Sequence, residues 1–130
     1  MLAVSLLHRI RKDLKKMGLP IEEVDLVVYK RYSSCYYGNY YSSLITKGRP
    51  LIKIYPYANK NRDMYPYDVI LDIVIHEMVH HLQFTSEDFV RYENIAHDQD
   101  FWKRYAYFIK RAKKKRLIHQ EYKGMGEVSI

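Results

Sequence analysis

Hydrophobic and polar positions alternate with helical spacing near the start of the chain. Apolar residues recur there every three or four positions, at Leu6, Leu7, Ile10, Leu14 and Met17. Basic residues fill most of the opposite face, at Arg9, Arg11, Lys12, Lys15 and Lys16. Because Gly18 and Pro20 then supply a stop signal, the pattern predicts an amphipathic first helix of about four to five turns.

The segment that follows is typical of β-structure. Residues 24–32 are rich in β-branched and aromatic side chains, which favour a strand. Residues 35–45 predict a second strand, in which Gly38 and Asn39 mark a turn or a bulge.

A turn at residues 47–50 leads to a third predicted strand over residues 51–57. Its Pro56 suits an edge or an end rather than a central position, because proline cannot donate a ladder hydrogen bond. We therefore expect this strand to be an exposed sheet edge, on which a peptide could pair by strand addition. Residues 59–63 are polar and predict a loop.

Residues 69–82 are apolar on nearly every face, which is the pattern of a buried helix. Pro66 lies where such a helix would begin, and Asp68 and Asp72 favour its positive end. After a polar, irregular segment over residues 85–96, another helix is predicted.

Asp98 and Asp100 open this last helix, whose apolar side carries Phe101, Tyr105, Phe108 and Ala112. The order of helix, strands, helix and helix predicts a single α+β domain over residues 1–130. Residues 118–130 are expected to form a flexible tail or a closing strand.

The buried helix carries the run His76-Glu77-Met78-Val79-His80 in its last two predicted turns. Positions four apart lie nearly one above the other on a helix. Two imidazoles there can bind one Zn²⁺, and the glutamate between them can act as general base on the metal-bound water. Burying two imidazoles and a carboxylate without a metal would be costly, so the motif favours a catalytic zinc site over a purely structural pair.

A third zinc ligand is expected after this helix. His97 has the right residue type and precedes a helix start, which would hold it firmly. Glu87 and Glu93 are competitors, but glutamates in a polar segment are usually solvated, so His97 is favoured. His81 lies about 100° around the helix from His80, which favours a structural or supporting role.

Composition limits the class of protein. The chain has 130 residues, of which 48% are hydrophobic, enough for one domain with a core. It has no stretch of 18 apolar residues to span a membrane, and its short apolar start runs into basic residues, the wrong order for a signal peptide. Cys35 is the single cysteine, which excludes an internal disulfide. We therefore expect a cytoplasmic protein.

The net charge of +7 and a pI near 9.4 favour polyanionic partners. Six cations crowd the end of the last predicted helix, at Lys110, Arg111, Lys113, Lys114, Lys115 and Arg116. The helix dipole accounts for two or three of them. Either the cations form a solvated helix end, or together with the basic face of the first helix they form a phosphate-binding surface, in which case the protein would associate with DNA or the nucleoid. Most of the 14 tyrosines are better explained as rings at the edge of a small core than as base-stacking surfaces.

The run His76-Glu77-Met78-Val79-His80-His81-Leu82, followed by His97-Asp98-Gln99-Asp100-Phe101, resembles the SprT-like zinc metallopeptidases, which include the Spartan protease. Their pattern is an HExxH helix, a polar segment, and a third histidine in an HGxxF or HGxxW context. The resemblance covers roughly residues 66–112 and has two departures. Asp98 replaces the family glycine, and the chain lacks the cysteine-rich ribbon and long DNA-binding extensions of many relatives.

This resemblance implies a compact zincin-like domain holding one Zn²⁺ on His76, His80 and His97, with Glu77 as the catalytic base and Phe101 as the packing aromatic. It implies a zinc-dependent endopeptidase that acts on DNA-bound or DNA-crosslinked proteins. The alternatives are a basic nucleic-acid-binding protein with a structural or vestigial zinc site, and a different metal hydrolase using the same helix.

Overall fold

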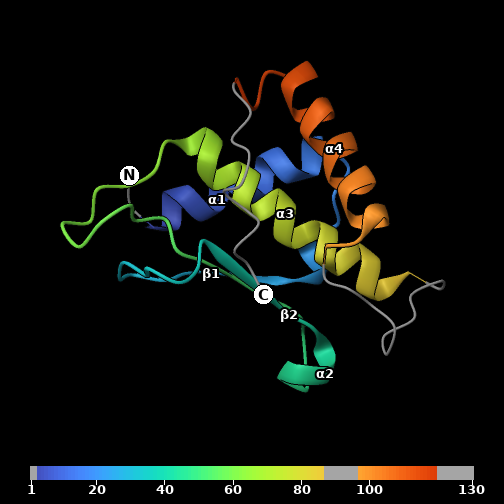
Figure 1. The fold of residues 1–130 in the computed structure, drawn as a ribbon, viewed down its shortest axis with the longest axis horizontal. Helices are drawn as coiled ribbons and strands as arrows, with labels where there is room; N and C mark the ends of the chain where they lie inside the picture. Colours follow the sequence, from blue (N-terminus) through green and yellow to red (C-terminus); the bar gives the residue numbers. More distant parts are fainter. Residues whose placement is uncertain (1–2, 87–96, 120–130) are drawn as a thin grey trace.

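The structure is a computed structural model that describes residues 3–86 and 97–119. In order, the elements are α1 (Ala3–Lys16), the short 3₁₀ helix η1 (Ile21–Glu23), β1 (Asp25–Val28), β2 (Gly38–Tyr41), α2 (Ser43–Thr46), β3 (Leu51–Ile54), α3 (Tyr67–Thr85) and α4 (Gln99–Lys114) (Figure 1). The predicted α+β class is confirmed for the described ranges.

The sheet has three strands in the order β1-β3-β2, with β3 parallel to β1 and antiparallel to β2. The prediction that residues 51–57 form a sheet edge is wrong, because β3 is the central strand. Pro56 is still accommodated, since the strand ends at Ile54 and leaves the proline beyond it. The edges of the described sheet are β1 and β2.

All three strands are shorter than the sequence predicts, and the second departs most. Gly38 and Asn39 do not turn or bulge the chain but begin β2, paired with Ile54 and Lys53. The reason is a close approach: a Cβ at Gly38 would lie 2.8 Å from Cγ2 of Ile73 on α3. Residues predicted as the end of this strand form the short helix α2 instead.

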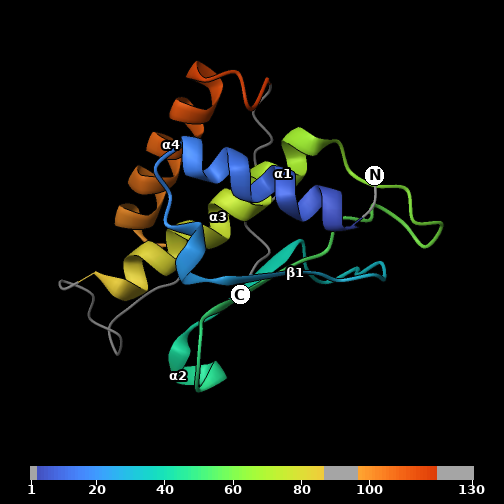
Figure 2. The ribbon, with the colours of Figure 1, turned by 180° about the vertical axis from the view of Figure 1, so that it is seen from behind.

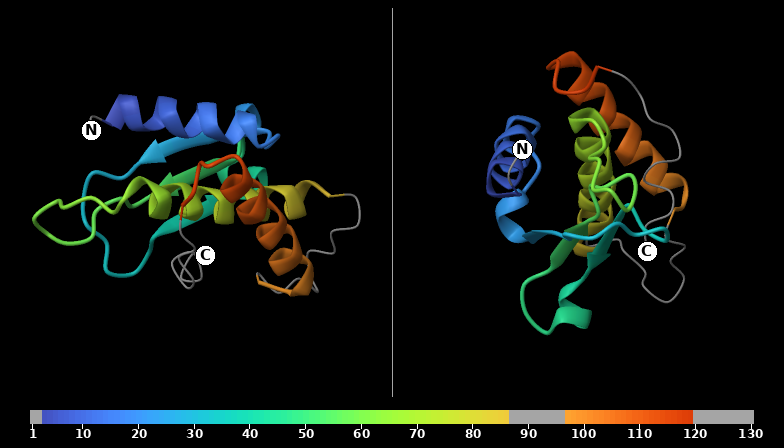
Figure 3. Two further views of the ribbon diagram at one scale, coloured as in Figure 1. Left: turned by 90° about the horizontal axis from the view of Figure 1, so that it is seen from above. Right: turned by 90° about the vertical axis from the view of Figure 1, so that its left-hand side faces the viewer.

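The helices are arranged around α3. In Figure 3, α1 and α3 lie over the sheet, and α4 packs on the side of α3 away from α1. Figure 2, in which the molecule is seen from behind, shows α1 in front, along the outside of the fold. Its predicted apolar stripe is buried at Leu6, Ile10, Leu14 and Met17. α3 is buried on almost every side, as its continuous apolar sequence predicts.

The ends of the long helices agree with their local signals. α3 begins directly after Pro66 and continues to Thr85, beyond the predicted end. α4 begins after Asp98, whose side chain accepts a hydrogen bond from the backbone N–H of Phe101. Most of the segment predicted as irregular, residues 87–96, lies outside the described residues.

At the start of the predicted tail, Ile118 is buried in the core and the backbone N–H of His119 donates to Asp68 at 2.8 Å. These two residues therefore pack with the domain, and residues 120–130 lie outside the described part. Among the helices that the structure describes, none is long and apolar enough to cross a membrane.

Candidate metal centre

Three histidines from two helix regions meet beside α3. The helix places His76 and His80 one turn apart on one face, with ring centroids separated by 5.1 Å. His97, just before α4, brings its Nε2 to 2.9 Å from Nε2 of His76. The ligand atoms of all three lie within 4.8 Å of one another. The three predicted ligands are thus close enough to bind one metal ion.

The donor set of this cluster, three imidazole nitrogens, is one that zinc accepts. Nitrogen ligands at about 2.0–2.1 Å from a tetrahedral ion lie about 3.3 Å apart. The pair His76–His97, at 2.9 Å, has the distance of a hydrogen bond between the two rings. Three imidazoles leave a fourth position for water or substrate, as in catalytic zinc sites.

Burial keeps the two helix histidines neutral. Burial, with a smaller contribution from the neighbouring histidines, lowers the pKa of His76 to about 2 and that of His80 to about 3. Their lone pairs are therefore available to a metal at neutral pH. The Nε2 of His80 is buried without a hydrogen-bond partner among the described residues. Such a nitrogen costs about 1–3 kcal/mol, a cost that a metal bond would remove.

Glu77 lies on the side of α3 that faces β2. Its side chain is 0% exposed. A Cβ on Gly38 would lie 3.2 Å from both Cγ and Oε2 of Glu77, so the glycine lets the strand approach the carboxylate. The strand β2 therefore packs against α3 at the residue that follows His76.

His81 does not belong to the cluster, in line with its predicted supporting role. It is buried, and both ring nitrogens have partners: Nδ1 lies 2.8 Å from the hydroxyl of Tyr40, and Nε2 lies 2.8 Å from Oε1 of Glu23. Since Tyr40 is on β2 and Glu23 is on η1, this histidine ties two other elements to α3. Neither partner of His81 could be identified from the sequence alone.

Aromatic rings from α4 line the cluster. The predicted Phe101 is fully buried, with its ring centroid 4.6 Å from that of His80, 4.7 Å from that of His76 and 4.9 Å from that of His97. Trp102 also lies against the histidines, with its ring centroid 5.8 Å from that of His97. The sequence pattern identified Phe101 but missed Trp102.

Two polar contacts hold α4 on α3, and sequence reasoning missed both. Asp72, which was assigned only to the positive end of α3, is buried one turn before His76 and accepts a short hydrogen bond from the Tyr105 hydroxyl. The signal was the spacing of four residues that puts Asp72 on the same helix face as His76.

The second contact lies at the start of α4. The buried amide of Gln83 donates to Asp98 at 3.0 Å and to Asp100 at 2.8 Å. Asp98 is the residue that departs from the SprT-like glycine. Here it caps α4 and joins that helix to the end of α3, directly after His97.

The basic segment lies at the opposite end of α4 from His97. Lys110 and residues 113–116 are exposed, and Arg111 is half-buried. Their cations therefore do not enter the histidine cluster. Glu87 and Glu93, the competing ligands, lie outside the described residues.

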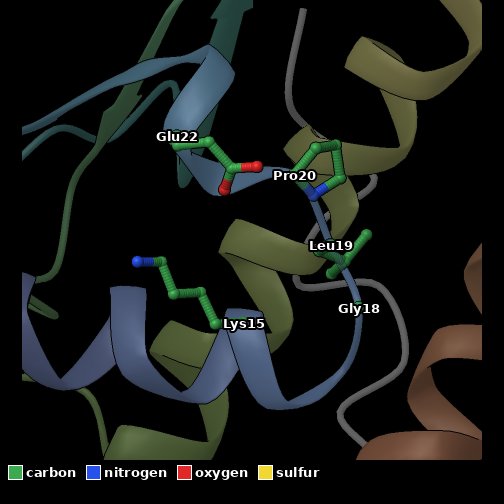
Figure 4. A pocket seen from close by; sticks show the side chains of 5 residues that line it. All are labelled: Lys15, Gly18, Leu19, Pro20 and Glu22. Atoms are coloured by element: carbon green, nitrogen blue, oxygen red, sulfur yellow. The ribbon is translucent and has the colours of Figure 1, made fainter.

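A hollow of about 410 Å³ lies elsewhere, where α1 meets η1 (Figure 4). It is lined by Lys15, Gly18, Leu19, Pro20 and Glu22, none of which contributes to the histidine cluster. This hollow is therefore separate from the candidate metal centre.

No family model, curated protein or solved structure matches the chain. The similarity to SprT-like peptidases accordingly remains a prediction from the motif residues.

Proposed function

We propose that this protein is a zincin-like, zinc-dependent endopeptidase, with one Zn²⁺ held by His76, His80 and His97. The observation that carries the proposal is the convergence of three imidazoles, from two separate segments, with a buried glutamate next to His76 in the sequence of α3. A hydrogen-bonded histidine pair would not need the third ring or the carboxylate. The SprT-like motif supports the same function.

Each protein group has a role that follows from its position. Bound zinc would supply Lewis acidity and make water a nucleophile near neutral pH. Glu77 accepts the proton of the attacking water and later returns it to the leaving amine, as general acid–base catalysis requires. Phe101 packs against all three imidazoles and limits their rotation, which keeps the ligands oriented.

The substrate chain is best placed along β2. The central position of β3 excludes the predicted pairing on residues 51–57. β2 has one free edge among the described strands, and its first residue, Gly38, lies against Glu77. A peptide added to this edge would therefore run past the carboxylate and the histidine cluster.

Metal content and proteolysis together test this function. Purified protein should contain one zinc per chain and cleave casein, and Glu77→Gln should keep the zinc while losing cleavage. Glu22→Gln, at an exposed glutamate outside the site, is the matched control and should change neither. Zinc-loaded protein that cleaves no protein, with or without single-stranded DNA, would contradict the proposal.

Single substitutions decide the third ligand. His97→Ala should abolish tight zinc binding, whereas Glu93→Ala and Glu87→Ala should leave it intact. The reverse result would reject the three-histidine site.

The exposed cations at Lys110 and residues 113–116 favour substrates bound or crosslinked to DNA, and they also carry the alternative function of nucleic-acid binding with a structural zinc. DNA affinity should fall steeply with salt and should weaken in a Lys113→Glu/Lys114→Glu/Lys115→Glu variant. Casein cleavage should be unchanged in that variant, since these residues lie away from the histidines. DNA binding without any proteolysis would favour the alternative.

A further inference from the structure

Trp102 is the single tryptophan of the chain, and it lies at the edge of the histidine cluster. Its ring centroid is 5.8 Å from that of His97, at an interplanar angle of 30°, and 6.3 Å from that of His76. The rings of Phe101 and Tyr105 contact it edge-on, at 5.1 Å and 5.7 Å. The indole is thus held in place by four aromatic rings.

Packing in the core alone does not explain why a tryptophan lies at position 102. The buried side of α4 is formed by Phe101, Ile109 and Ala112, and Trp102 lies next to that side with 36% of its surface exposed. The other exposed large apolar residues of the described part are Val27, Tyr29, Leu44, Ile45 and Tyr107. Of this set, Trp102 is the residue with ring contacts to the histidines.

A substrate must approach the histidine cluster, and the partly exposed Trp102 lies at the edge of that cluster. The carbonyl to be cleaved has to reach the metal, so the side chain beside it comes within a few ångströms of the ligand rings. On the side of α3 that faces β2, Gly38 lies against Glu77. On α4, Trp102 is an exposed ring in contact with the histidines.

We propose that Trp102 forms the wall of a side-chain subsite that selects substrates with a large aromatic or aliphatic residue next to the cleaved bond. This inference rests on the proposed peptidase function. A large apolar side chain on the indole removes apolar surface of both partners from water, and aromatic side chains gain further from ring–ring contact. Glycine or alanine at the same substrate position would leave the indole exposed.

Cleavage specificity tests the subsite directly. Sites cut in casein by zinc-loaded wild type, Trp102→Ala and Trp102→Phe should be mapped by mass spectrometry, and kcat/KM measured for matched peptides carrying Phe or Ala beside the cut bond. Trp102→Ala should lower the Phe-over-Ala ratio by about tenfold or more. Trp102→Phe should retain most of the preference. Tyr107→Ala is the control, because Tyr107 is 57% exposed on the same helix and makes its ring contact with Phe108.

A binding measurement separates this inference from the peptidase function. In zinc-loaded Glu77→Gln, the emission of Trp102 should shift to shorter wavelength with the Phe peptide but not with the Ala peptide. If wild type cleaves peptides and Trp102→Ala keeps the same preference, the subsite is rejected and the peptidase stands. If cleavage is absent but the emission responds to the Phe peptide, the peptidase function fails and the apolar subsite stands. Absence of both responses rejects both.

Discussion

Replacing Asp98 by alanine and by glycine should distinguish two contributions to stability: the cap of α4, and the hydrogen bond that attaches α4 to α3. One carboxylate oxygen of Asp98 accepts from the backbone N–H of Phe101 at 2.8 Å and from the amide of Gln83 at 3.0 Å. Loss of an N-cap carboxylate to alanine costs about 1 kcal/mol, and to glycine only a few tenths. Loss of the Gln83 bond costs about another 1 kcal/mol, because Gln83 keeps its second acceptor, Asp100.

The free energy of unfolding of the metal-free protein should therefore decrease by about 2 kcal/mol in Asp98→Ala and by about 1 kcal/mol in Asp98→Gly. Urea titrations with EDTA at pH 7 give these values if the slopes are unchanged. Zinc should stabilise Asp98→Ala less than wild type, because His97 directly precedes the loosened helix start.

Asp100→Ala is the matched control for this comparison. It removes the 2.8 Å contact to Gln83 and a partly exposed ion pair with Arg104, but it keeps the helix cap. Its cost should be about 1 kcal/mol. Equal stability of Asp98→Ala and Asp98→Gly would refute the capping role, and a cost near zero for both would refute the whole assignment.

Three further predictions concern the histidines and the wall formed by β2. Metal-free protein should lose stability as the pH falls below 6.5, at about 1.4 kcal/mol per pH unit for each of His76 and His80. The reason is that these two histidines bind protons in the unfolded chain at this pH, whereas in the folded state their lowered pKa keeps them neutral. Urea midpoints measured in EDTA from pH 7 to pH 5 check this. Gly38→Ala should cost about 1–3 kcal/mol by overpacking against Ile73, and it should lower kcat by displacing Glu77; urea titration and casein assays measure the two effects. Cu²⁺ or Co²⁺ should quench the emission of Trp102 with one-to-one stoichiometry.

Each of these three has a control. A His76→Gln/His80→Gln variant should flatten the pH dependence, and an unchanged slope would reject its assignment to these rings. Gly48→Ala should be neutral, since a Cβ there meets nothing within 4 Å; an equal cost at Gly38 and Gly48 would contradict the close approach. Metal quenching that persists in His97→Ala would place the ion elsewhere.

The parts of the fold that the sequence predicted well depend on neighbouring residues. The stripe of α1, the proline before α3 and the cap of α4 are signals within one or two turns, and all three are confirmed. Strand order is not local. Residues 51–57 read as an edge because of Pro56, but pairing with β1 and β2 made the preceding residues central. Similarly, Gly38 was interpreted as a turn or bulge signal, whereas its role is to allow the close approach of α3, which is distant in the sequence.

In the site too, local geometry could be predicted from the sequence and non-local geometry could not. The spacing of His76 and His80 is fixed by α3 alone, whereas the distance from His97 to both depends on how α4 is held. Two hydrogen-bonded contacts set that position: Asp72 with Tyr105, and Gln83 with the first residues of α4. A metal ion bridging His97 to α3 would reinforce the same contacts, so under the proposed function metal binding and the packing of α4 would be thermodynamically coupled. Because coupling is reciprocal, the factor by which a bound ion favours packed over loosened α4 equals the factor by which packing of α4 raises the affinity for the ion. The metal affinity would therefore depend on the α3–α4 interface as well as on the three histidines.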